Sequence, residues 1–184
     1  MRAGVTPDAL TLAGLAGAAA TAGLVVTRHW LIAGLVFVAA SLMDMLDGSL
    51  ARMSGRASDV GAFMDSTLDR LAEGLVLGAI GVVLARDGHW PAVGACFLAL
   101  TASFLVSYTR ARAEGLGVED DLGGLMSRPE RLVLVGAGIF LAPLGRALEI
   151  VIVVLAVLSL VTVGQRIRNA RRALQHRQPA RRNS

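Results

Sequence analysis

The sequence predicts an all-α protein with six transmembrane helices. Composition is the first observation: 54% of the 184 residues are hydrophobic and 17% are charged, against about 45–50% apolar and about 25% charged residues in an average soluble domain. The second observation is that about six stretches approach the ~20 apolar residues that a helix needs to cross a membrane. The third is that arginines gather on alternate connections between these stretches.

The expected spans cover nearly the whole chain and leave no room for a separate soluble domain. They are roughly residues 7–27, 30–53, 59–85, 89–110, 129–145 and 147–168. We therefore expect one six-helix transmembrane domain over residues 1–168 and a basic cytoplasmic tail over 169–184. We expect the tail to fray into a disordered arm that rests on anionic lipid, and we do not expect it to bind nucleic acid.

The first two spans begin with recognisable signals. Thr6-Pro7-Asp8 supplies a hydroxyl N-cap, a proline at the first helical position and an acid in the first turn. Small residues over 14–20 favour close packing against a neighbouring helix. The second span starts at Trp30, an aromatic residue typical of the membrane interface.

The third span is polar only in its first half, before an apolar run over 75–84. We interpret Asp59 and Glu73 in this half as solvated or arginine-paired acids. The fourth span contains the single cysteine, Cys96, which cannot form an intrachain disulfide. The fifth begins at Pro129, and the sixth leads into the basic tail.

The distribution of arginine sets the expected orientation. With the N-terminus in the cytoplasm, fourteen arginines fall at the cytoplasmic ends of the spans, seven of them between Arg166 and Arg182, and three fall at the far ends. This excess follows the positive-inside rule. We therefore expect a multi-pass protein of the inner membrane, with the acid-rich ends of the second and third spans facing the cytoplasm.

Four acids on these two spans carry the strongest chemical signal. Asp44 and Asp47 are three residues apart, and Asp65 and Asp69 are four apart, so each pair lies on one helix face. A charged side chain deep in a span costs about 2.5–3.5 kcal/mol, and clustered carboxylates repel one another without cations. An all-oxygen cluster suits hard divalent ions such as Mg²⁺, Mn²⁺ or Ca²⁺, and we expect a metal site here.

The acids belong to a longer pattern, D-x2-D-G-x2-A-R-x8-G-x3-D-x3-D. Its fixed positions are Asp44, Asp47, Gly48, Ala51, Arg52, Gly61, Asp65 and Asp69. This pattern resembles the signature of the CDP-alcohol phosphotransferase family, and the six expected spans agree with that family's fold. The resemblance implies a homodimeric enzyme of the lipid bilayer that joins an alcohol to the phosphatidyl group of CDP-diacylglycerol and releases CMP.

The resemblance also implies a role for each position of the pattern. Asp69 would be the general base that takes the proton from the acceptor hydroxyl. Two Mg²⁺ ions per active site, with Mn²⁺ as an alternative, would be held by Asp44, Asp47 and Asp65. The cytidine diphosphate site would be lined by Gly48, Ala51, Arg52 and Gly61.

Arginines beyond the third span indicate that the acceptor carries a phosphate. Pro129 places arginines beside the exposed N–H groups of a helix start, where anions are favoured, and arginine forks bind phosphate. The expected phosphate pocket consists of Arg110, Arg128, Arg131 and Arg166. The segments S-Y-T-R-A-R-A-E and R-P-E-R resemble the bacterial phosphatidylinositol phosphate synthases, which often carry Lys at the position of Arg110. Inositol phosphate is therefore the expected acceptor.

Other interpretations remain open at this point. Glycerol 3-phosphate also brings a phosphate, so a phosphatidylglycerol phosphate synthase fits the same motif. A divalent metal-ion transporter would also bury acids in helices, but near the bilayer midplane, whereas these acids cluster toward one face. A membrane prenyltransferase would need more spans than this chain offers.

Overall fold

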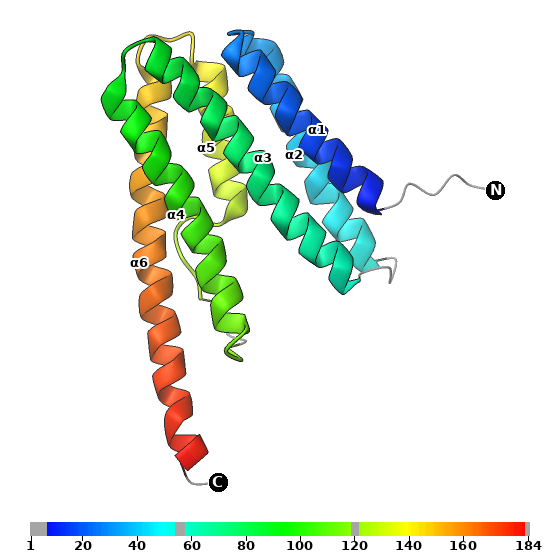
Figure 1. The fold of residues 1–184 in the computed structure, drawn as a ribbon, viewed down its shortest axis with the longest axis vertical. Helices are drawn as coiled ribbons and strands as arrows, with labels where there is room; N and C mark the ends of the chain where they lie inside the picture. Colours follow the sequence, from blue (N-terminus) through cyan, green and yellow to red (C-terminus); the bar gives the residue numbers. More distant parts are fainter. Residues whose placement is uncertain (1–6, 54–57, 119–121, 183–184) are drawn as a thin grey trace, which may run out of the picture.

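The computed structural model describes residues 7–53, 58–118 and 122–182, with side chains placed over 11–43, 58–118 and 122–175. Over these residues the chain forms six α-helices and no β-strand (Figure 1). The helices are α1 (Pro7–Val26), α2 (Trp30–Met53), α3 (Asp59–Arg86), α4 (Trp90–Glu114), α5 (Arg128–Leu141) and α6 (Ala147–Arg182). The all-α prediction is confirmed, and the first four helices begin within one residue of the expected starts.

The helices form three antiparallel hairpins whose short loops meet at one end of the molecule, at the top of Figure 1. Arg28 in the first loop pairs with Asp87 in the second at 2.5 Å. His89 Nδ1 lies 2.9 Å from Glu149 Oε1 at the start of α6, which ties the second hairpin to the third. The opposite end carries the start of α3, the end of α4 and the C-terminal part of α6.

Each helix has two main neighbours, so the six helices close into a ring. Their order around it is α1, α2, α5, α6, α4, α3 and back to α1. The expected close packing of the small residues in α1 is confirmed at Gly17, where a Cβ would lie only 2.6 Å from the Cβ of Ala40 in α2. It is not found at Ala16, Ala19 and Ala20, which are exposed. In this ring α3 and α5 face each other without being main packing partners.

Two helices of the described chain are long and apolar enough to cross a membrane: α4, over Trp90–Glu114, and the Ala147–Gln175 part of α6. Only 33% and 39% of their most apolar stretches are buried, so both present apolar surface outward. The fifth helix has 14 residues, fewer than the ~20 of a full span, and ends at Leu141 instead of the expected 145. The count of six spans therefore stays a prediction.

The sixth helix extends beyond the span expected for it. Its backbone remains helical to Arg182, whereas we expected a disordered arm from residue 169. The arginine, alanine and glutamine residues that dominate 170–182 are good helix formers, and the helix can continue from an already formed span without a new nucleus.

The segment before α5 fixes where this helix begins. Residues 122–126 run along one face of α6, and Figure 1 shows this connection rising from the lower end of α4 to a helix start inside the bundle. Four side chains of α6 bind its backbone: Asn169 donates to Leu122 O at 2.9 Å, Arg166 to Gly123 O at 2.9 Å, Gln165 accepts from Leu125 N at 3.0 Å and Thr162 from Met126 N at 3.0 Å. These side chains share a helix face, and they satisfy polar backbone groups that burial would otherwise leave unpaired.

Gly124 lets the segment lie this close to α6. Its φ is +124°, in the region that favours glycine, and a Cβ there would lie 2.6 Å from Thr162 Cγ2. Thr162 Oγ1 donates to Leu158 O at 2.8 Å, which leaves its oxygen oriented to accept from Met126 N. One threonine thus serves its own helix and the segment.

We predict that Thr162→Val lowers the stability of the protein. Valine has the same shape but cannot accept from the buried Met126 N–H, and an unsatisfied buried donor costs about 1–3 kcal/mol. The midpoint of thermal unfolding in detergent micelles is the measurement. Thr109→Val is the matched control, because that hydroxyl donates to carbonyls of its own helix. Equal midpoints for the two variants would contradict the prediction.

Candidate functional site

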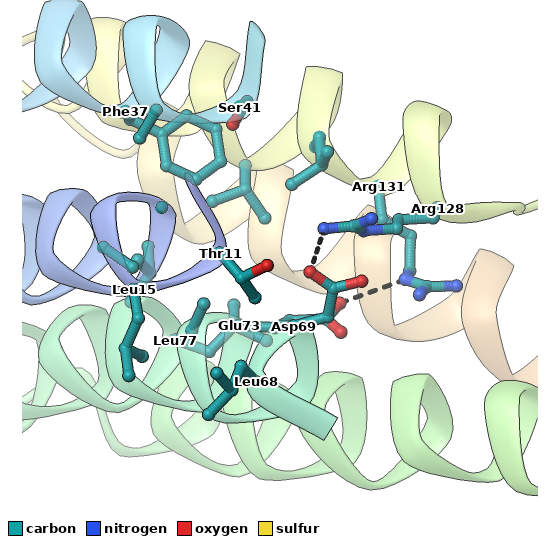
Figure 2. A pocket seen from close by; sticks show the side chains of 17 residues that line it. Thr11, Leu15, Phe37, Ser41, Leu68, Asp69, Glu73, Leu77, Arg128 and Arg131 are labelled. Atoms are coloured by element: carbon teal, nitrogen blue, oxygen red, sulfur yellow. Dashed lines mark hydrogen bonds and ion pairs between the residues drawn. The ribbon is translucent and has the colours of Figure 1, made fainter. Parts of the chain in front are cut away.

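A cleft lies inside the ring, between α1, α2, α3 and α5. Its walls are mostly apolar, but four charged side chains, Asp69, Glu73, Arg128 and Arg131, gather in it. Figure 2 shows the two acids on α3 and the two arginines on α5 pointing toward one another. The helices that face each other across the ring are thus connected by charge.

The four side chains form two ion pairs. Arg128 Nη2 binds Asp69 Oδ1, and Arg131 Nε donates to Glu73 Oε1 at 3.0 Å. The acids are four residues apart and the arginines three, so each set lies on one helix face and the two pairs stack about one turn apart. The side chains of Asp69 and Arg131 are 9% and 3% exposed. At such burial, removing one partner leaves an uncompensated charge, which costs about 3–5 kcal/mol.

Glu73 connects three helices. Besides Arg131 of α5, its carboxylate accepts from Arg70 of its own helix at 3.1 Å and from the Ser103 hydroxyl of α4. Our sequence interpretation of Glu73 as an arginine-paired acid is confirmed, but it missed the position of this acid in the cleft. Its spacing of four residues from Asp69 was the signal that could have revealed it, since that spacing places both on one face.

Arg131 has a donor with no hydrogen-bond partner in the described part of the chain. The residue is 2% exposed, and its Nη1 is buried with no hydrogen-bond partner among the described residues. Buried polar groups are nearly always hydrogen-bonded. The cleft therefore contains a cationic nitrogen that is suited to a ligand acceptor.

The predicted metal site lies only partly within the described side chains. Asp65 stands one turn before Asp69 on α3, and Gly61 lies in the first turn, where its N–H donates to the N-cap hydroxyl of Ser58 at 3.0 Å. Five motif residues have side chains outside the described part: Asp44, Asp47, Gly48, Ala51 and Arg52. Among described side chains there is no group of three acids, histidines or cysteines that could hold a metal. The metal ligands therefore stay a prediction.

The expected donor set nevertheless fits a hard divalent ion. The backbone is helical at Asp44 and Asp47 as well as at Asp65 and Asp69, so the spacing places each pair on one face. All four donors are carboxylates, the ligands that Mg²⁺ and Mn²⁺ prefer.

The four arginines of the expected phosphate pocket do not share one environment. Arg128 and Arg131 line the cleft. The guanidinium of Arg166 donates to two backbone carbonyls, Gly123 O and Val106 O, at 2.9 and 2.7 Å. Arg110 is exposed and donates to Glu114 at 2.8 Å on its own helix. The structure thus brings two of the four together, and it gives Arg166 a role in holding the segment before α5.

Comparison with known proteins identifies relatives over nearly the whole chain. The phosphatidylinositol phosphate synthase of Mycolicibacterium smegmatis is 41% identical over 178 residues, covering 93% of this chain and 80% of the relative. The archaetidylinositol phosphate synthase of Pyrococcus horikoshii is 34% identical over 172 residues, covering 94% of this chain and 87% of the relative.

Solved structures give the same result. Phosphatidylinositol phosphate synthase of Mycobacterium tuberculosis with CDP-DAG bound has a TM-score of 0.83 and 34% identity, covering 92% of this chain and 88% of that one. The same enzyme in complex with manganese and citrate has a TM-score of 0.82 and 35% identity, covering 92% and 84%. The family model for CDP-alcohol phosphatidyltransferases matches residues 4–168. With its motif, its fold and these matches in agreement, the chain belongs to the CDP-alcohol phosphatidyltransferase family.

Proposed function

We propose that this enzyme transfers the phosphatidyl group of CDP-diacylglycerol to inositol phosphate and releases CMP. The observation that carries the choice of acceptor is the pair of arginines, Arg128 and Arg131, opposite Asp69 in the cleft. An acceptor that brings a phosphate would supply a hydrogen-bond acceptor for Arg131 Nη1, which has none among the described residues. The names of the relatives from Mycolicibacterium and Mycobacterium support the same acceptor.

The reaction joins the acceptor to lipid in one displacement. The acceptor hydroxyl attacks the phosphorus that bears diacylglycerol, and the bond from that phosphorus to the bridging oxygen of CMP breaks. CMP leaves with the electron pair, and the hydroxyl proton passes to Asp69 as general base. An acceptor phosphate would compete with Asp69 for Arg128, so its arrival would release the carboxylate for proton transfer.

We assign the metal requirement to Mg²⁺, with Mn²⁺ as an alternative and two ions per active site. Asp44, Asp47 and Asp65 would hold them, which the all-carboxylate donor set supports. The manganese complex of the Mycobacterium tuberculosis relative supports divalent metal use. When bound, the ions would neutralise charge on the diphosphate and on the departing CMP.

The remaining parts of the proposal concern the membrane. We place the protein in the inner membrane with six spans, the active site facing the cytoplasm, residues 169–184 as its basic cytoplasmic tail and a homodimer as its assembly. The apolar surfaces of α4 and α6 support the membrane location, and the arginine distribution supports the orientation. The homodimer rests on the family resemblance, and cross-linking in native membranes tests it.

We predict that purified protein with CDP-diacylglycerol and Mg²⁺ releases CMP when inositol 1-phosphate is added. Glycerol 3-phosphate, inositol and serine are the other arms of the measurement. The unphosphorylated acceptors should give little CMP, because they cannot occupy the arginines. Release with glycerol 3-phosphate alone would keep the reaction class and overturn the acceptor. Activity with inositol or serine equal to that with inositol 1-phosphate would overturn the phosphate pocket.

We predict that Asp69→Asn lowers kcat by about 10²–10⁴, the usual contribution of a general base, because an amide cannot take the proton. Asp59→Asn is the matched control: this acid is exposed in the first turn of the same helix, and its loss should leave kcat unchanged. Circular dichroism and Mn²⁺ binding by electron paramagnetic resonance verify that both variants are folded and hold metal. A folded, metal-binding Asp69→Asn protein with full activity would contradict the assignment.

A further inference from the structure

We infer that Glu73, which lies outside the family motif, is a positioning residue of the acceptor site. It holds the guanidinium of Arg131 in the orientation in which one nitrogen meets the acceptor's phosphate. The identity of the phosphate-bearing acceptor rests on the proposed function, whereas the orientation of Arg131 rests on the contacts of the cleft.

The contact between Glu73 and Arg131 uses only part of the arginine. Glu73 Oε1 accepts from Arg131 Nε at 3.0 Å, while Arg131 Nη1 is buried without a hydrogen-bond partner in the described chain. A guanidinium is a rigid fork, so fixing Nε fixes the direction of the other two nitrogens. Phosphate oxygens are strong acceptors for such a nitrogen.

The carboxylate of Glu73 is itself held from two further sides. Arg70 Nη1 donates to Oε2 at 3.1 Å, and the Ser103 hydroxyl of α4 donates to Oε1. Three donors on one carboxylate restrict its rotation, so the Glu73 oxygen that accepts from Arg131 Nε is held in one position. The chain of contacts runs from Ser103 on α4 through Glu73 on α3 to Arg131 on α5, and Figure 2 shows its last link.

The charge at this end of the cleft also favours an anion. Three arginines, Arg70, Arg128 and Arg131, contact the two carboxylates of Asp69 and Glu73. Among these five described side chains the guanidiniums outnumber the carboxylates by one, and a phosphate monoester carries about −1.5 to −2 charge at pH 7.

The test is the effect of Glu73→Gln on acceptor and donor kinetics. Glutamine keeps the size but loses the charge, and its amide cannot accept from all three donors. We expect the KM for inositol 1-phosphate to rise about tenfold, the usual scale for one charge-assisted hydrogen bond. The KM for CDP-diacylglycerol and the kcat should stay within about twofold of wild type.

Glu149→Gln is the matched control. The side chain of Glu149 is 12% exposed, against 13% for Glu73. It binds Arg146 at 3.1 Å and lies 2.9 Å from His89, at the hairpin end of the molecule. This variant loses a comparably buried, ion-paired carboxylate without touching the cleft. It should keep the wild-type KM for inositol 1-phosphate. Its loss of thermal stability should be smaller than that of Glu73→Gln, because its partner Arg146 is 81% exposed whereas Arg131 is 3% exposed.

A double-mutant cycle separates positioning from general damage. If Glu73 acts through Arg131, then Glu73→Gln raises the acceptor KM no further in an Arg131→Gln background. Additive effects, or a fall in kcat with an unchanged acceptor KM, would overturn the inference. Where Glu73→Gln does not fold, Ser103→Ala replaces it as the milder change, and an unchanged acceptor KM in that variant would likewise overturn the inference.

A calorimetric measurement of inorganic phosphate binding tests the inference independently of the proposed function. If the wild-type protein uses no inositol phosphate, the proposed acceptor fails. Weaker phosphate binding by Glu73→Gln than by Glu149→Gln would still support the positioning of Arg131. Equal phosphate binding by the two variants would overturn it.

Discussion

Two stacked ion pairs between α3 and α5 are the constraint on which the rest of the structure depends. Asp69 with Arg128, and Glu73 with Arg131, connect two helices that face each other across the ring. Because charge inside an apolar bundle is costly unless it is paired, the ring cannot close around these residues in another register. The charged end of the cleft follows from this requirement, with a motif acid on one wall and two arginines on the other.

The arginines reach that position because α5 begins inside the bundle. Four side chains of α6 bind the irregular segment before it, and Gly124 allows the close approach. The polar face of α6 thus determines where the first turn of α5 lies, and with it Arg128 and Arg131. Arg166 contributes to the site through this support, by binding Gly123 O and Val106 O.

Local signals predicted most of the fold. Helix starts at Pro7, Trp30 and Asp59 follow from capping residues, prolines and the ends of apolar runs, which need no tertiary information. The start of α5 was predicted to within one residue, but its end at Leu141 comes before the expected 145. The support of the segment before it could not be predicted, because Thr162 and Gln165, which bind that segment, lie far along the chain. The tail was expected to be disordered from its charge, yet its backbone continues the helix that precedes it.

The sequence likewise predicted one part of the candidate site and missed another. The acids of the motif are identifiable because their spacing is fixed by one hairpin. The role of Glu73 was missed because its partners Ser103 and Arg131 lie 30 and 58 residues away, so only the folded chain reveals them. Arg110 and Arg166 share a residue type with the cleft arginines, but charge alone does not distinguish an arginine that lines the cleft from one that binds a backbone carbonyl or an acid of its own helix.

The loops of the three hairpins are joined at one end of the molecule, through Arg28 with Asp87 and His89 with Glu149. A bundle fastened at one end behaves as a hinge, because a small change in helix angle there produces a displacement that grows along the helices. Any spreading that admits a lipid with two acyl chains is therefore greatest at the opposite end, where the first turn of α3 lies. The loop end of the bundle is thus the pivot, and Gly61 of the motif lies at the end that moves most.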